Sequence, residues 1–300
     1  MADIITRGTN MPPVVVEEMF NAVAGHSALA RLSAQRPINF NGTREFVFTL
    51  DKEADIVAEN GAKSNGGGAA TPVTMIPVKF EYGLRVSDEF MYGSEEYRMD
   101  VLRTFAEGAG RKFARGFDIA AMHGLNPRTG SASAVVGTNC FASQVTNKVS
   151  YTTADVNLTS AIGAVQAADG EVNGLAMAPA FSSAMAAITS NGVAQYPEFR
   201  FGANPERFYG MRTDVNSTVA FDGETMAIVG DFDAFKWGYA KNIELEVIEY
   251  GNPDNDADLG DLKGHNQVYL RCEAYIGWGV LAPDRFAIIT TGTASSGGLK

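Results

Sequence analysis

The chain has 300 residues, 45% hydrophobic and 20% charged, which are the proportions of a folded protein rather than a disordered one. The 24 basic residues oppose 35 acidic ones, and the resulting net charge of −11 excludes a protein devoted to general nucleic-acid binding. No run approaches the roughly 20 apolar residues of a spanning helix, and no signal peptide is visible. Cys140 and Cys272 cannot build a disulfide framework, which favours a reducing compartment. The length alone favours two domains.

Residues 1–37 are predicted to form an arm that contains one short helix. Pro12 and Pro13 favour an extended entry, and the apolar residues that follow repeat with the spacing of one helical face. These residues are Val16, Met19, Phe20 and Val23. Gly25 is expected to end the helix, because glycine readily adopts the backbone conformation that closes one.

Residues 38–86 are predicted to form a long two-stranded finger. Apolar and polar side chains alternate in residues 46–50, which is typical of a strand exposed on one side, and residues 54–59 are expected to continue it. Residues 60–70 are rich in glycine and predict a flexible tip, after which residues 75–86 are expected to return as the second strand. Two strands of about 20 residues would reach about 65 Å. The alternative is an ordinary hairpin folded back on its own core.

The longest helix is predicted from Ser94 to His123. Ser94 can cap its first turn, Glu95 and Glu96 suit the positive end of the helix dipole, and Gly124 is expected to end it. About 28 residues at 1.5 Å each predict a rod of about 42 Å. Its apolar face comprises Val101, Leu102, Phe105, Ala109, Phe113 and Phe117.

The rest of the chain is predicted to alternate helices and strands. Helices are expected over residues 153–168 and 180–190, and strands over 174–178, 208–215, 226–230 and 243–250. Residues 268–276 give the strongest strand pattern, because apolar and polar side chains alternate strictly there.

The motifs of common enzymes are missing, so no cofactor is expected. Neither a Walker phosphate loop nor a G-x-G-x-x-G motif occurs, and the three histidines are far apart in sequence. Residues 254–258 have the alternating aspartates that open a calcium-binding loop, but Leu259 and His265 replace the glycine and glutamate that such a loop needs. Residues 244–261 hold seven acids and no lysine or arginine, which favours a solvated acidic loop. An arm, a finger and a rod bury apolar surface poorly in one chain, which favours assembly over catalysis.

Several short motifs occur in an order that resembles one known family, the Hong Kong 97-type major capsid protein of tailed bacteriophages. The motifs are Ala54-Asp55-Ile56-Val57-Ala58-Glu59 with Lys63, Ser87-Asp88-Glu89-Phe90, Asp118-Ile119-Ala120-Ala121-Met122-His123-Gly124, Gly230-Asp231-Phe232, Asn266-Gln267-Val268-Tyr269-Leu270-Arg271-Cys272-Glu273, Ala282-Pro283 and Phe286-Ala287. The resemblance covers nearly the whole chain.

The resemblance implies an α+β fold divided into four parts. These are an N-terminal arm (1–37), an extended β-hairpin loop (38–86), a peripheral domain with a long spine helix (87–150 and 239–300) and a mixed α/β axial domain (151–238). Many members carry a scaffolding segment before the arm. If Met1 is the true start, scaffolding is expected to come from a separate protein or to be dispensable.

The resemblance also implies a function as a shell protein of the virion, assembled in the host cytoplasm. Hexamers and pentamers would close into an icosahedral shell around double-stranded DNA, with a portal protein, possible scaffolding, maturation-protease or decoration proteins, and no membrane. An encapsulin-type compartment and a cytosolic α/β enzyme stay as alternatives. Because the chain is acidic, we expect the wall to bind DNA weakly. Basic residues that could still face inward are Arg7, Arg31, Arg103, Arg111 and Arg115.

Some members of the family crosslink their subunits, and the resemblance places Lys63, Asn266 and Glu273 at the three positions involved. A neutral lysine amine would attack the asparagine side-chain amide and release ammonia, while the glutamate takes up the proton. Each residue also has a simpler interpretation. Lys63 can keep a loop soluble, Asn266 can cap a turn, and Glu273 can pair with Arg271.

Overall fold

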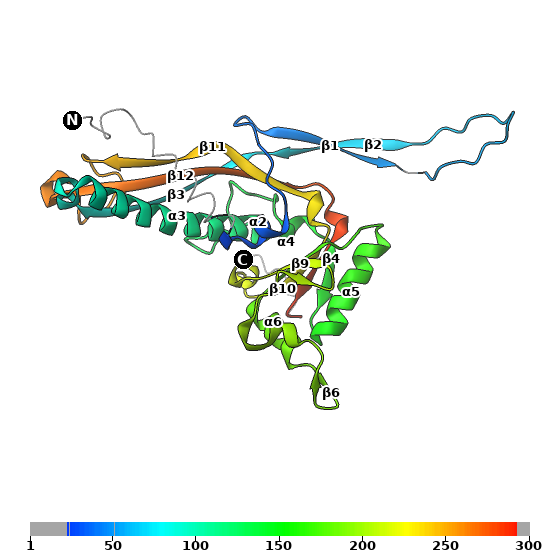
Figure 1. Cartoon of the computed structure of the whole chain (residues 1–300). Helices are drawn as coiled ribbons and strands as arrows, with labels where there is room; N and C mark the ends of the chain where they lie inside the picture. Colours follow the sequence, from blue (N-terminus) through cyan, green and yellow to red (C-terminus); the bar gives the residue numbers. More distant parts are fainter. Residues whose placement is uncertain (1–22, 24, 51, 293–300) are drawn as a thin grey trace, which may run out of the picture.

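A computed structural model of the chain describes residues 23, 25–50 and 52–292 (Figure 1). The helix predicted around Val16, Met19 and Phe20 lies outside the described residues and stays a prediction. Val23 is described, and its side chain is fully buried in the main hydrophobic core. A short helix, α2 (Ala28–Leu32), follows it.

The larger part of the molecule is a long sheet that lies along a long helix (Figure 1). The sheet is antiparallel and has the order β11-β12-β3, formed by β11 (Phe235–Ile248), β12 (Gln267–Val280) and β3 (Pro77–Ser87). The helix is α3 (Glu95–His123). Alternate side chains of β12, from Val268 to Ile276, are buried, which confirms the strand predicted from their pattern.

The ends of α3 lie where the sequence places them. Ser94 Oγ accepts a hydrogen bond from the backbone N–H of Tyr97 at 3.3 Å, and Glu95 and Glu96 occupy the first turn. Gly124 ends the helix with φ of 71°, a left-handed conformation that favours glycine. A side chain could not fit there in any case, because a Cβ would lie 2.9 Å from Cys140 Sγ.

Aromatic side chains fill the space between α3 and the sheet. The ring of Phe117 lies 5.2 Å from that of Trp237 and 5.6 Å from that of Trp278, measured between ring centroids. Trp278 also donates its indole N–H to the carbonyl of Asn139 at 2.8 Å, which satisfies its buried polar atom.

A second unit is built on a six-stranded mixed sheet of order β4-β13-β10-β5-β9-β8. Its strands are β4 (Asn147–Ser150), β5 (Gly174–Met177), β8 (Arg207–Phe208), β9 (Met211–Val215), β10 (Thr225–Gly230) and β13 (Phe286–Thr290). The helices α5 (Ala154–Ala167) and α6 (Pro179–Ala187) contribute to a second hydrophobic core. Strands β4 and β13 lie outside residues 151–238, so this sheet uses more of the chain than the predicted axial segment. The division into domains stays a prediction.

The remaining elements are short. They are α4 (Phe141–Gln144), β6 (Thr189–Ser190), β7 (Val193–Ala194) and the 3-10 helices η1 (Asp88–Tyr92), η2 (Pro197–Gly202), η3 (Ser217–Ala220), η4 (Phe232–Ala234), η5 (Lys263–His265) and η6 (Pro283–Arg285). Among the described residues, no helix combines the length and apolar character that crossing a membrane requires.

The paired strands of the finger are shorter than the sequence predicts. Strand β1 (Thr43–Leu50) pairs with β2 (Gly68–Met75), from Thr43 opposite Met75 to Leu50 opposite Gly68. These strands of eight residues span about 26 Å. The prediction that residues 54–59 continue the first strand is wrong, because they form part of the loop that joins β1 to β2.

The second strand of the finger also ends earlier than predicted. Residues 77–87 leave the finger and pair with β12 as β3. Pro77 lacks the backbone N–H that a continuous ladder would need, and it begins the new strand. Val78, Phe80 and Tyr82 then bury their side chains against the core beside α3, which is burial that a free hairpin could not provide.

Candidate assembly surfaces

The finger exposes one apolar face. Phe46, Phe48 and Leu50 are 62%, 72% and 77% exposed, and the residues opposite them on β2 include Ala70 and Pro72. We call these five residues the finger face. Side chains two apart on a strand point the same way, so the three large ones form a continuous stripe. An isolated two-stranded hairpin is marginally stable in water, so such a stripe calls for a covering surface.

The opposite side of the finger is anchored to the body of the molecule. Glu45 forms an ion pair with Lys236 of β11, and Met75 at the end of β2 is buried. Gly279 of β12 makes room for this contact, since a Cβ there would lie 2.8 Å from Met75 Cγ. The root of the finger is therefore fixed, while its outer part projects beyond the end of the three-stranded sheet (Figure 1).

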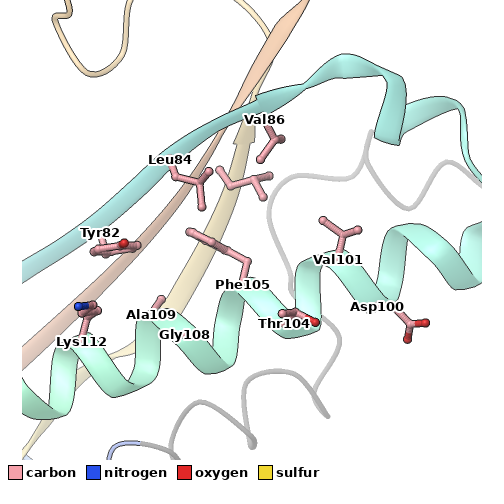
Figure 2. Close-up of a pocket in the computed structure, with 11 residues that line it drawn as sticks. Tyr82, Leu84, Val86, Asp100, Val101, Thr104, Phe105, Gly108, Ala109 and Lys112 are labelled. Carbon is pink, nitrogen blue, oxygen red and sulfur yellow. The ribbon is translucent and has the colours of Figure 1, made fainter.

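An apolar groove of about 520 Å³ lies between β3 and the first half of α3. Figure 2 shows Leu84 of β3 and Phe105 of α3 pointing toward one another across it. Gly108 lies on its helical wall, where a Cβ would meet no atom within 4 Å. We call this the β3–α3 groove. Tyr82, Val86, Val101, Ala109 and Leu270 complete its apolar lining.

The finger and the groove lie toward opposite ends of the sheet. The root of the finger is beside Met75 and Gly279, whereas the groove takes its strand residues from 82–86 of β3. The finger projects away from the groove (Figure 1). One chain cannot place its own finger face in its own groove.

The three predicted crosslinking residues are not brought together within one chain. Lys63 is exposed in the loop that joins β1 to β2. Asn266 is exposed just before β12, with φ of 52°, and its carbonyl accepts a hydrogen bond from the N–H of Asp88 at 2.9 Å. Glu273 is seven residues further along, a distance of about 23 Å on a strand. The three could meet only between different copies.

Glu273 takes part in ion pairs within its own chain. Its Oε1 lies 2.7 Å from Lys79 Nζ and 3.5 Å from Arg271 Nε, and neither contact uses Oε2. The hydrogen bond to Glu273 raises the pKa of Lys79, so that lysine stays protonated and is no nucleophile. The simpler interpretation of Glu273, a pairing with Arg271, is thus present within the chain.

The acidic loop of residues 249–262 is held to the body by Arg85 of β3. The Arg85 guanidinium donates to Asp254 at 2.5 and 2.8 Å, to Asn252 Oδ1 at 2.8 Å and to the Gly260 carbonyl at 2.9 Å. Asp256 Oδ1 accepts from the N–H groups of Asp258 and Leu259. Among the described residues, no group of three or more His, Cys, Asp or Glu is placed to hold a metal ion.

Asp118 on α3 is a fully buried carboxylate, to which its place in a family motif assigned no role. It accepts hydrogen bonds from Ser27 Oγ (2.5 Å) and from the N–H groups of Ala28 (2.8 Å) and Leu29 (3.2 Å) at the start of α2. Thr218 Oγ of η3 donates to it at 3.0 Å. Burial raises the pKa of Asp118 to about 6, although these hydrogen bonds act in the opposite direction. One side chain thus joins three separate segments.

Arg31 is not a free basic residue. It forms an ion pair with Asp214, whose side chain is only 2% exposed. A nearby pair joins His123 Nδ1 to Asp222 Oδ2 at 3.1 Å. Burial acts to raise the pKa of Asp222, but the contact with His123 outweighs it and holds that pKa below its usual range.

Comparison with known proteins identifies the relatives of this chain. The model of the phage capsid family matches residues 8–291. The chain belongs to the phage capsid family. No match was found among curated proteins.

Solved structures from several phages show the same fold. A chain of Mycobacterium phage Ogopogo shares 32% sequence identity, with 88% of this chain and 92% of that chain covered and a TM-score of 0.75. A chain of Gordonia phage Cozz shares 26% sequence identity, with 88% of this chain and 86% of that chain covered and a TM-score of 0.72. The capsid of an empty GTA particle, computed with C5 symmetry, is 14% identical, covers 98% and 94%, and has a TM-score of 0.63, so it supports the fold alone.

Membership of the capsid family confirms the resemblance to the capsid proteins of tailed phages and the structural role. The mixed α and β architecture agrees with the expected α+β class. The family is one of structural proteins of the virion, and the comparisons do not favour the cytosolic enzyme or the encapsulin-type compartment. The motifs were recognisable in the sequence. The groove and the Asp118 contacts were not, because they join residues far apart along the chain.

Proposed function

We propose that the chain is the major capsid protein of a tailed phage and that it assembles with itself into a closed shell. The observation that carries this proposal is the exposed finger face, which puts three large apolar side chains on a hairpin that no described residue covers. The family and the assembled capsid among the structural relatives support it.

In the proposed contact, the finger face of one copy lies in the β3–α3 groove of the next. Phe46, Phe48 and Leu50 supply the apolar surface, and Leu84 and Phe105 receive it. Because the finger and the groove are different surfaces at opposite ends, the contact is head-to-tail. Such contacts close into rings when the rotation between copies permits. Hexameric and pentameric rings of this kind would build an icosahedral shell.

The shell would enclose double-stranded DNA and would meet a portal protein, with separate scaffolding, maturation-protease or decoration proteins as further partners. A net charge of −11 per chain disfavours tight binding of phosphates by the wall as a whole. The genome would be held by confinement rather than by affinity.

Expression of the chain followed by electron microscopy tests the proposal. We expect closed particles of uniform size, and we expect DNA-filled particles when the phage portal and packaging proteins are present. A single monomer peak in size-exclusion chromatography at micromolar concentration would contradict self-assembly. Particles that take up protein cargo and never DNA would instead indicate a compartment shell.

We further propose that Lys63 of one copy and Asn266 of another form an isopeptide bond, with Glu273 of a neighbouring copy taking up a proton. The lysine amine attacks the Asn266 side-chain carbonyl carbon, a new C–N bond forms, and the amide nitrogen leaves as ammonia. The Glu273 carboxylate, whose Oε1 contacts Lys79 and Arg271, would accept the lysine proton.

Denaturing gel electrophoresis of mature particles tests the crosslink. We expect a ladder above the 32.0 kDa chain that resists boiling in detergent. Lys63→Arg should reduce the ladder to a single band, because the guanidinium stays protonated, while particles still form. Glu273→Gln should slow the ladder without abolishing assembly. A single band from mature wild-type particles would contradict the crosslink and leave the shell function intact.

A further inference from the structure

A second hollow, of about 620 Å³, lies beside the β3–α3 groove and carries positive charge. Its cationic side chains come from two separate parts of the chain. Lys112 and Arg115 are exposed on α3, and Arg128 is exposed on the segment that follows α3. Asn126 and Ser133 add neutral hydrogen-bonding groups. We call this the cationic hollow.

The described residues offset the charge of the hollow only in part, through Glu81. Among the described residues, Lys112, Arg115 and Arg128 form no ion pair. Arg115 donates to Ser217 Oγ at 3.0 Å and lies 5.6 Å from the centre of the Phe221 ring, and both partners are neutral. Three cations in one concave surface favour an anionic occupant.

The two charged residues of β3 beside the hollow do not change this balance. Lys79 and Glu81 alternate with Val78, Phe80 and Tyr82, and the latter three pack on the core beside α3. Both residues nevertheless line the hollow. Lys79 forms an ion pair with Glu273, and the single negative charge of Glu81 leaves the three cations Lys112, Arg115 and Arg128 in excess.

The same chain carries an uncompensated acidic surface at the other end of β3. In the loop of residues 249–262, Arg85 pairs with Asp254, but Glu249, Asp256, Asp258 and Asp261 form no ion pair among the described residues. Asp258 is exposed. The four contacts that Arg85 makes with Asp254, Asn252 and Gly260 hold the loop in place. It therefore cannot move along β3 into the cationic hollow of its own chain.

We propose that the acidic loop of one copy binds in the cationic hollow of the next copy. The hollow uses residues 78–82, at the finger end of β3, and the loop is held at Arg85, toward the other end. A head-to-tail contact brings those two ends together, so the finger face and the hollow would act in the same interface. Pairing opposite charges in this interface also offsets the repulsion between chains that each carry a net charge of −11.

This inference rests on the proposed shell function. Reversing the charges of the hollow and of the acidic loop, separately and together, tests the loop contact independently of the shell function. Variant one carries Lys112→Glu and Arg128→Glu, and variant two carries Glu249→Lys and Asp258→Lys. A third variant combines all four changes. Arg200→Glu, an exposed cation on η2, is the matched control. Assembly is followed by light scattering against protein concentration, and circular dichroism verifies that each chain is folded.

We expect each two-residue variant to raise the concentration needed for assembly at least about tenfold. The four-residue variant should return toward the wild type, because the charges are exchanged but still complementary, and Arg200→Glu should assemble as the wild type does. Normal assembly of variant one would overturn the proposal, as would failure of the four-residue variant to recover. Normal particles of variant one with altered DNA content would assign the hollow to phosphates instead. If the wild-type chain forms no particles, the shell function itself fails.

Discussion

Replacing Phe48 by aspartate is expected to weaken assembly of the shell strongly while leaving the chain folded. The side chain is 72% exposed in the single chain, so no core contact is lost. In the proposed contact it would be covered by the next copy, and burying it is worth about 1.5–3 kcal/mol. An aspartate there would in addition be buried without a partner. The concentration needed for assembly should rise at least about a hundredfold.

Thr49→Asp is the matched control for Phe48→Asp. Thr49 is the next residue on β1, is also exposed, and points to the opposite face of the hairpin. The Thr49→Asp variant adds the same charge to the same strand, and we expect this variant to assemble nearly as the wild type does. Leu84→Asp tests the receiving side, since Leu84 is 39% exposed at the β3–α3 groove. Equal assembly of Phe48→Asp and Thr49→Asp would show that the finger face is not the contact.

The sequence was sufficient to predict elements whose signals are local. Both ends of α3 were predicted correctly from Ser94, the two glutamates after it and Gly124. Such signals are local, because helix caps and helix-ending glycines act within one turn. The strict alternation of residues 268–276 likewise predicted β12. Each of these depends on neighbours in the chain.

The finger was predicted too long because strand pairing is not local. Residues 75–86 have a strand pattern, but that pattern does not specify a partner. Val78, Phe80 and Tyr82 gain more burial beside β12 and α3 than in a hairpin, and Pro77 allows the change of partner. The β3–α3 groove follows from this pairing, and for that reason the sequence alone could not reveal it.

The Asp118 contacts could be only half anticipated. Ser27 before an apolar run has the character of a helix cap, and Ser27 Oγ does accept from the N–H of Ala30 at 3.0 Å. Nothing local indicates that the carboxylate 91 positions further along the chain would meet the same hydroxyl. An aspartate among the apolar residues at the end of α3 was the available signal.

Asp118→Ala is expected to lower the free energy of unfolding by about 3–5 kcal/mol. Four buried donors, from Ser27, Ala28, Leu29 and Thr218, would lose their common acceptor, and α2 would be detached from α3 and η3. Asp100→Ala, which removes an exposed carboxylate from the same helix, is the control and should change stability little. Chemical denaturation in the assembly-deficient Phe48→Asp background measures the single chain.

The pH dependence of the free energy of unfolding shows whether Asp118 stabilises the fold in its neutral or in its ionised form. Burial raises its pKa from 3.8 to about 6, so between these values the folded chain binds more protons at this site than the unfolded chain. The stability that comes from the neutral carboxyl is therefore complete below pH about 4 and is lost as the pH rises through about 6, an effect of about 3 kcal/mol. The difference in stability between the parent chain and Asp118→Ala should be largest at and below about pH 4 and should shrink as the pH rises toward 7. The Asp222–His123 pair acts in the opposite direction but is common to both chains, so it cancels in that difference. A difference that grows with pH would show that Asp118 is stabilised as an ion and that the hydrogen bonds from α2 and η3 outweigh its burial.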